Sequence, residues 1–221
     1  MTGLKARVGL VTLLAAAFAP RAPAEILHVD AANSGGPWDG SPEHPFTNIV
    51  DAAAALAATN AVTKGGHEIR VAPGTYRGRV DFTTNHAGVA AAPNGLTAPG
   101  RAVVTAPYRA LNLNNADYFV IDGFDFTGTF ASDAGDIYGG AIYLEGTPAS
   151  NRVQNCTFYD NRRNGIGISA SKMTRLKAYI ENCTFYGNLY AGIASYAWND
   201  IHVRNCVFVG NYTTHSRGYE A

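Results

Sequence analysis

Charged residues are scarce in this sequence. Only 15% of the 221 residues are Asp, Glu, Lys or Arg, whereas about a quarter is usual, and 17 basic residues balance 17 acidic ones. Proteins that bind nucleic acids usually carry a strong basic excess, so the balance argues against that class of partner. Because 47% of the residues are hydrophobic, the chain has ample apolar surface to bury and is not expected to be disordered.

Long apolar runs are also missing. The longest covers residues 8–19 and would rise only about 18 Å as a helix, too little for a hydrocarbon core of about 30 Å. It follows Lys5 and Arg7 and precedes an A-x-A site that ends at Ala24. This pattern predicts a signal peptide at residues 1–24 and a secreted protein, whether extracellular, periplasmic or at the cell surface. No later segment is long enough to be a membrane span.

A short repeat takes the place of helical patterning in the second half of the chain. Residues 153–158, 180–185 and 203–208 align without gaps as [V/I]-x-N-C-x-F, and each is followed by a second Asn three residues after the Phe. Residues 121–126 form a fourth copy with Gly at the Asn position and Phe at the Cys position. A period in the twenties built from short strands predicts a β-solenoid. The Leu scaffold of leucine-rich repeats is absent.

The alternation within one copy predicts which side chains point inward. Val153, Cys156 and Phe158 should face the core, and Asn155 breaks the alternation between two strands. Asn and Gly tolerate the left-handed conformation that a sharp bend requires, so we expect a bend at each equivalent position. We also expect these bend Asn side chains to hydrogen-bond from coil to coil as an amide ladder. The bend positions are Gly123, Asn155, Asn182 and Asn205. The row formed by Cys156, Cys183 and Cys206 should hold free, buried thiols.

The N-terminal part predicts a cap for the solenoid. Thr47 or Asn48 can cap a helix that begins near Ile49, and the Gly65–Gly66 pair ends it. Its apolar stripe comprises Ile49, Ala53, Leu56 and Ala57. We therefore divide the chain into a signal peptide (1–24), an N-terminal strand and capping helix (25–68), and β-helix coils (69–221). After Asn211 no closing helix is visible, so we expect further coils or a partner to cover the open solenoid end.

Together these segments resemble the right-handed parallel β-helix of the pectin-lyase-like superfamily. The likeness rests on the repeat, on the entry segment 29–56, on Pro73-Gly-Thr-Tyr76 within 67–80, and on residues 118–128. It implies an all-β right-handed parallel β-helix with a short N-terminal capping helix, and the activity of a polysaccharide lyase. Because this fold carries many activities, function has to be argued from the site.

In the resembling lyases the Gly-led strands form the sheet that carries the substrate cleft. Here their outward positions are Ala141, Tyr143, Gly167 and Ala194, none of them an acid or a base. The calcium-binding carboxylates of such lyases are thus missing from these strands. Asp133 and Asp136, in the loop before the first of them, are the candidate calcium ligands; the alternative is that both are solvated turn residues.

An acid-free stretch at 161–180 predicts a positive field beside these strands. Its cations are Arg162, Arg163, Lys172, Arg175 and Lys177, and the aromatic residues Tyr190, Tyr196 and Trp198 follow. We interpret these residues as a binding surface for an acidic polysaccharide; the alternative is a solvated loop beside ordinary surface aromatics.

A lyase acting on such a polymer needs a cation to neutralise the uronate carboxylate and a base to remove the adjacent ring proton. Lys172 is the candidate base by position. The rival hypothesis is a non-catalytic surface adhesin or structural β-helix. It is supported by residues 139–142 and the F-x-x-N repeats, which resemble those of polymorphic outer-membrane adhesins.

Overall fold

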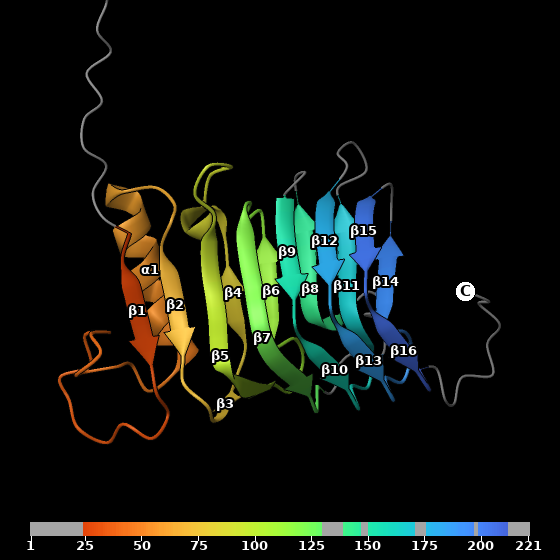
Figure 1. Cartoon of the computed structure of the whole chain (residues 1–221), viewed down its shortest axis with the longest axis horizontal. Helices are drawn as coiled ribbons and strands as arrows, with labels where there is room; N and C mark the ends of the chain where they lie inside the picture. The colour runs from red at the N-terminus through yellow and green to blue at the C-terminus, as the bar shows by residue number, and fades with distance from the viewer. Residues whose placement is uncertain (1–23, 130–138, 147–149, 171–175, 197–198, 212–221) are drawn as a thin grey trace, which may run out of the picture.

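The computed structural model describes residues 24–129, 139–146, 150–170, 176–196 and 199–211. They form a parallel β-solenoid whose coils stack side by side along the long axis of the molecule (Figure 1). One five-stranded sheet comprises β4 (Val80–Phe82), β6 (Leu111–Asn114), β8 (Gly140–Gly146), β11 (Asn164–Ala170) and β14 (Ile193–Tyr196).

An eleven-stranded sheet supplies the other two faces of the solenoid. Its first face contains β1 (Ile26–Val29), β2 (Glu68–Val71), β9 (Ser150–Gln154), β12 (Lys177–Glu181) and β15 (Asp200–Arg204). Its second face contains β3 (Thr75–Arg77), β10 (Thr157–Tyr159), β13 (Thr184–Tyr186) and β16 (Val207–Val209). The long strands β5 (Asn94–Thr105) and β7 (Phe119–Thr127) turn the corner and belong to both faces.

The predicted bends lie at the corner between these two faces and are confirmed. Asn155, Asn182 and Asn205 have φ angles of 53°, 54° and 51°, and Gly123 has a φ of 83°. A Cβ atom at Gly123 would lie 2.5 Å from the backbone oxygen of Ala98, so only glycine fits there. Asn occupies the equivalent position in the later coils because Asn residues tolerate a left-handed backbone conformation.

The buried amide ladder lies at the other Asn of each repeat, which corrects the sequence-based placement. Asn161 donates from Nδ2 to Asn188 Oδ1 over 2.8 Å, and Asn188 donates in the same way to Asn211 over 2.8 Å. Asn161 and Asn188 are almost fully buried, whereas the bend residues Asn155 and Asn182 are exposed. The bend row is only partly bonded, with Asn205 donating to Asn182 over 3.2 Å.

Each ladder amide also ties one coil to the next through the backbone. The Nδ2 atoms of Asn161, Asn188 and Asn211 donate to the carbonyl oxygens of Phe126, Phe158 and Phe185 over 3.0–3.1 Å. A buried turn must satisfy its backbone groups, and the ladder amides supply hydrogen bonds to the Phe carbonyl oxygens of the preceding coil. The F-x-x-N spacing therefore serves the turn that leads into the five-stranded sheet.

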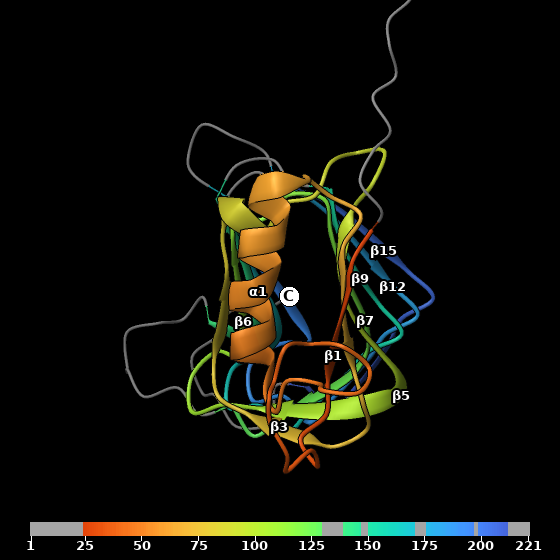
Figure 2. The ribbon, with the colours of Figure 1, turned by 90° about the vertical axis from the view of Figure 1, so that its left-hand side faces the viewer.

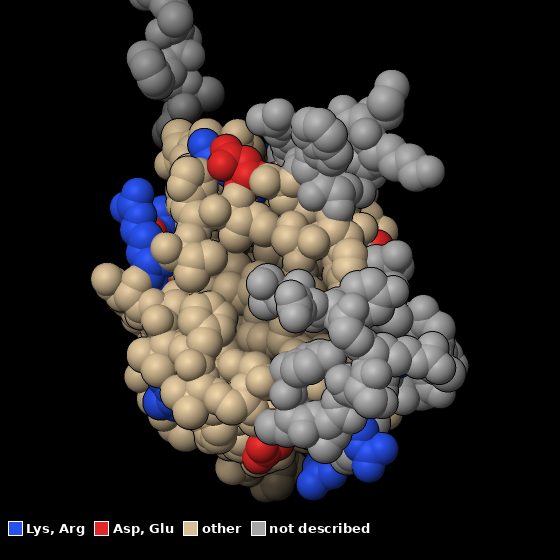
Figure 3. Space-filling view, turned by 90° about the vertical axis from the view of Figure 1, so that its right-hand side faces the viewer, with Lys and Arg blue, Asp and Glu red and all other residues tan. Residues whose placement is uncertain are grey.

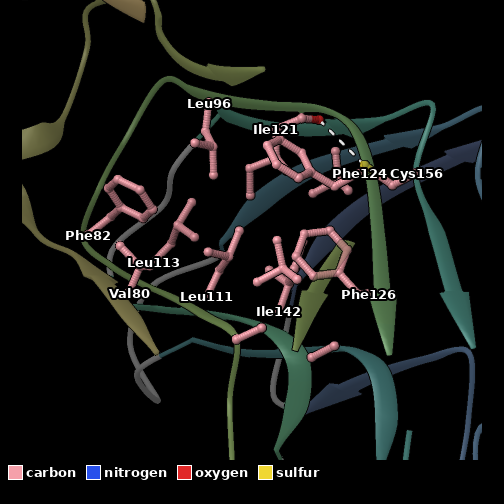
Figure 4. Close-up of a cluster of buried hydrophobic side chains, with 14 of the residues drawn as sticks. Val80, Phe82, Leu96, Leu111, Leu113, Ile121, Phe124, Phe126, Ile142 and Cys156 are labelled. Atoms are coloured by element: carbon pink, nitrogen blue, oxygen red, sulfur yellow. Dashed lines mark hydrogen bonds between the residues drawn. The ribbon is translucent and has the colours of Figure 1, made fainter. Parts of the chain in front are cut away.

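The core consists of matching side chains stacked from coil to coil. The rings of Phe126, Phe158, Phe185 and Phe208 stack with centroids 5.0, 4.8 and 4.8 Å apart, as the in-register strand pairing requires. Figure 4 shows Phe124, Phe126 and Cys156 converging with aliphatic residues of the five-stranded sheet.

The cysteine row is confirmed as free thiols. Cys156 and Cys183 are buried and Cys206 is half-buried. Each thiol lies 3.1–3.2 Å from the carbonyl oxygen two residues earlier in its own coil, which can accept its weak hydrogen bond. The row therefore behaves as small core residues with a repeated local contact.

Helix α1 (Ile49–Val62) covers the N-terminal end of the core (Figure 2). Asn48 is its N-cap, accepting a hydrogen bond from the Asp51 amide over 2.9 Å, as predicted. Of the predicted stripe, Ile49, Ala53 and Leu56 are buried; Ala57 is half-buried. The buried face instead includes two residues that the prediction left out, Ala52 and Asn60. No helix in the described ranges is long and apolar enough to cross a membrane.

The last described coil presents apolar side chains at the other end. Val203, Val207, Phe208 and Val209 are 44–59% exposed. Figure 3 shows that the described surface of this end is largely uncharged, with basic and acidic residues at its edges. The expectation that further coils or a partner cover this end stays a prediction.

Candidate functional site

The outward face of the five-stranded sheet carries a graded row of side chains. The register places Asp81, Asn112, Tyr143, Gly167 and Ala194 in one line across β4, β6, β8, β11 and β14. Polar and aromatic groups therefore occupy the first three strands, and small residues the last two. A second row, two residues further along the strands, contains Glu145, Ser169 and Tyr196.

Arg109, in the turn just before β6, lies on this face over an aromatic ring. Its guanidinium carbon is 3.8 Å from the ring centroid of Tyr143 and 4.9 Å from that of Tyr108. Burial lowers the pKa of Arg109, and the nearby Tyr143 and Glu145 oppose that shift. An arginine remains charged at neutral pH even so, and a partly desolvated cation over an aromatic face is held strongly.

A chain of polar contacts orients this arginine. Arg79 donates from Nε to Asp81 over 3.0 Å, and Asn112 donates from Nδ2 to the same carboxylate over 2.9 Å. The amide oxygen of Asn112 is thereby directed toward Arg109, whose Nη1 donates to it over 3.5 Å. Asp81 acts on Arg109 through Asn112 and sets the direction of its guanidinium.

A second arginine–tyrosine pair lies two coils further on. Arg163 directly precedes β11, and its guanidinium carbon is 4.7 Å from the ring centroid of Tyr190, in the turn before β14. The Tyr190 amide also donates to the Arg163 carbonyl over 3.4 Å. Arg109 and Arg163 are thus alike in that each precedes a strand and lies over a tyrosine of the following coil, although Tyr143 is part of β8 and Tyr190 lies in the turn before β14.

The remaining predicted site residues are distributed unevenly around these pairs. Arg162 is exposed beside Arg163, and its amide donates to Thr129 over 3.0 Å. Tyr196 ends β14 on the same sheet. Lys172, Arg175, Trp198, Asp133 and Asp136 lie outside the described residues.

Lys177 does not join the arginines. It is the first residue of β12, on the neighbouring face, and its Nζ is 5.5 Å from the ring centroid of Tyr179. The seven-residue strand β11, which spans about 23 Å, and six further residues lie between Arg163 and Lys177. The acid-free stretch is thus divided between the two ends of one strand.

Metal ligands are not grouped within the described part of the chain, where no three His, Cys, Asp or Glu side chains lie together. Glu145 is the acidic residue of β8. It pairs in register with Ser169 rather than with another acid. Calcium at Asp133 and Asp136 stays a prediction.

Sequence reasoning missed Arg79, Asp81, Arg109 and Asn112. It placed Tyr143 outward but gave it no role, because it looked for an acid or a base there. The coils that carry the missed residues lack the N-C-x-F repeat, so no alignment assigned their outward positions. Alternation in 79–82 and 111–114, where apolar residues alternate with polar ones, was the signal that could have found Asp81 and Asn112.

Comparisons with known proteins identify the architecture. The family model for the right-handed β-helix region matches residues 79–218. No curated protein matches the chain. A solved structure titled "Crystal structure of pectate lyase Pel9A" is 18% identical, with a TM-score of 0.42, over 85% of this chain. The matched part is 64% of that structure's chain, so this protein corresponds to less than two thirds of it.

Proposed function

Since this chain belongs to the right-handed β-helix family, we propose that it binds an acidic extracellular polysaccharide along the outward face of its five-stranded sheet. The observation that carries the proposal is the repeated arginine–tyrosine construction, Arg109 on Tyr143 and Arg163 on Tyr190. The fold itself carries no function, so the argument rests on these side chains.

The chemistry of a uronate polymer matches this construction. Each sugar offers a carboxylate, which a guanidinium recognises in a planar, bidentate manner. Tyr143 is buried beneath Arg109 and supports the guanidinium from below. Arg109 and Arg163 precede β6 and β11, which are separated by β8. Their strands are therefore about 10 Å apart, a distance that a short oligosaccharide spans.

The predicted signal peptide supports an extracellular polymer as the ligand, because a secreted protein meets such polymers. A supporting feature inside the site is the fixed direction of Arg109, which Asp81 and Asn112 hold in place. A guanidinium held in one direction loses little freedom when it binds a carboxylate.

We propose more specifically that the protein cleaves this polymer as a polysaccharide lyase. In β-elimination a base removes the ring proton beside the carboxylate, the glycosidic C–O bond breaks, and the departing sugar oxygen is protonated, leaving an unsaturated end. Arg109 is suited to neutralise the carboxylate during proton removal. Lys172 remains the candidate base from its position in the sequence.

Binding to polygalacturonate and to alginate, measured by calorimetry at increasing salt, tests the proposal. We expect binding that weakens as salt rises, because exposed charges are screened beyond about 8 Å at physiological ionic strength. The double variant Arg109→Gln, Arg163→Gln should lose at least ten-fold in affinity. Formation of unsaturated ends, followed by ultraviolet absorbance, tests the lyase separately.

Arg152→Gln is the matched control. Arg152 also lies over a tyrosine, 5.2 Å from the ring centroid of Tyr179, but on the β9–β12–β15 face. Equal loss in this control would show that overall charge, not the five-stranded sheet, attracts the polymer. Absence of binding to either polyuronate at low salt would overturn the proposal and favour the adhesin or scaffold.

A further inference from the structure

The capping helix is fastened to the first coil by a buried histidine. His86 ends the short 3-10 helix η1 (Thr84–His86) and is 7% exposed. Its Nε2 lies 3.1 Å from the carbonyl oxygen of Ala53 in α1, and its Nδ1 accepts the backbone N–H of Thr83 over 2.9 Å. One imidazole therefore bridges the solenoid and the helix that closes it.

The two backbone partners determine the protonation state of this ring. A carbonyl oxygen can only accept, so Nε2 must carry a proton, and a backbone N–H can only donate, so Nδ1 must be bare. His86 is thus required to be neutral with its proton on Nε2. A second proton on Nδ1 would face the Thr83 N–H and remove that hydrogen bond.

The rest of the junction offers a charged ring one neutral acceptor, the Thr83 hydroxyl oxygen 3.3 Å from Nδ1, and no counter-charge. The ring of Phe82 meets the imidazole edge to face, with centroids 5.3 Å apart. Beside it, Asn60 of α1 donates to the carbonyl oxygens of Asn85 and Ala87 over 2.7 and 3.0 Å, and Asn94 donates to the His86 carbonyl over 3.0 Å. These groups are neutral, so an imidazolium here would be buried without a counter-charge.

Charged residues on the elements around His86 act elsewhere. Asp81 on β4 accepts hydrogen bonds from Arg79 and Asn112 on the outer surface. Asp51 lies in the first turn of α1, and Lys64 beyond its end interacts with Asp117. The pKa of His86 is lowered by burial, with hydrogen bonds to backbone as the only opposing influences.

His67 makes comparable contacts near the other end of the helix. Its Nε2 is 2.5 Å from the Thr63 carbonyl oxygen, and its Nδ1 accepts the Glu25 N–H over 3.2 Å. It is followed directly by Glu68, which accepts hydrogen bonds from Arg70.

We propose that His86 is an acid-sensitive latch, whose protonation at Nδ1 releases helix α1 from the first coil and opens the N-terminal end of the solenoid core. The released surface would be the apolar face of α1 together with Phe82, which packs 4.6 Å from Phe119. The latch is a property of the cap and is independent of the polysaccharide site.

The lowered pKa of His86 determines how the stability of the docked helix changes with pH. A histidine that is held neutral in the folded state stabilises that state fully above its ordinary pKa of 6.5. Below pH 6.5 the released form takes up protons more readily than the docked form. The stabilisation is therefore lost as the pH falls from 6.5 toward the lower pKa of the docked ring.

Hydrogen–deuterium exchange of the α1 peptide, compared at pH 7.5 and pH 5.0 after correction for intrinsic rates, tests the latch. In the native protein we expect protection of α1 to fall at least ten-fold on acidification, while a peptide covering β12 and β13 changes little. His86→Gln retains a donor for Ala53 but cannot titrate, so its α1 protection should be insensitive to pH. His202→Gln is the control, because His202 lies near the opposite end, stacked on Tyr179.

Two outcomes would overturn the proposal: native α1 protection that is independent of pH, or an equal acid-induced loss in His86→Gln. If the variant does not fold, NMR titration of the histidine rings in the native protein decides. A His86 ring that protonates at or above pH 6.5 would contradict the latch. A ring that stays neutral until α1 protection is lost would support it.

Discussion

Single side chains in this solenoid have distinct tasks even where the repeats share one residue type. The bend residue Asn182 is exposed with a left-handed backbone, and the ladder residue Asn188 is buried with its amide fully bonded. One Asn is needed for its backbone freedom and the other for its side chain.

Asn182 allows the backbone requirement to be measured. Asn182→Gly keeps the left-handed conformation and loses only the contact with Asn205, so we expect little change in stability. Asn182→Val forces a β-branched residue to a φ of 54° and should lower the free energy of unfolding by about 2 kcal/mol. Urea denaturation of both variants provides the comparison. Equal stability of the two would show that the bend imposes no backbone constraint.

The thiols should differ in reactivity along their row. Cys206 lies in the last described coil and is half-buried, so it should react first with a thiol reagent in the native protein. Burial raises the pKa of both the Cys156 and the Cys206 thiols, so access to the reagent rather than the thiolate fraction should set the order. After denaturation without reductant, three equivalents should titrate. A yield of one equivalent would reveal a disulfide and contradict the parallel row.

The bends could be predicted from sequence because a left-handed φ is a local preference of Asn and Gly. The ladder could not be assigned in the same way, since both Asn rows recur with the same period. Which row is buried depends on how the turn after Phe158 packs against the neighbouring coils, and that is a tertiary property.

At the scale of elements, the capping helix is stabilised by one side-chain cap and an apolar face. Asn48→Ala removes the acceptor for the Asp51 amide and should lower the free energy of unfolding by about 1 kcal/mol. Asn48→Ser, which keeps an acceptor at that position, should restore most of the loss. Chemical denaturation of the two variants measures the difference, and equal loss in both would assign the effect to packing instead.

The strands that carry the arginine site show where sequence reasoning reaches its limit. β10 and β13 could be placed because their repeats align. β4 and β6 precede the repeat, so only the alternation within each strand pointed to their outward residues, and it is the register with β8 that places them in one row with Tyr143. The arginines themselves are in turns, where no periodicity fixes their direction.

At the scale of the whole molecule, the solenoid has two unlike ends. The N-terminal end is closed by α1, and the opposite end exposes Phe208 and its valine neighbours. The described contacts run between neighbouring coils and, at Arg101, to the coil after next, so the two ends do not touch and each can open without the other. Release of the helix on acidification should therefore leave the last coils unchanged.

The in-register stacking also means that consecutive coils of the repeat are structurally equivalent units. Tyr159 and Tyr186 follow the same Thr-Phe pair in consecutive coils and stack with centroids 5.2 Å apart. Excising residues 159–185 would join Phe158 directly to Tyr186 and restore the Thr-Phe-Tyr sequence at this point of the coil. The shortened protein should fold cooperatively with two thiols instead of three and be about 4.8 Å shorter along its axis.

A frame-breaking deletion of residues 159–178 is the control, since it places core positions on the surface and should abolish cooperative unfolding measured by circular dichroism. If both deletions behave alike, the coils are not separable units. If only the in-frame deletion folds, a lineage carrying this sequence can change the length of its five-stranded face by whole coils, through duplication or loss, without redesigning any of the coils that remain.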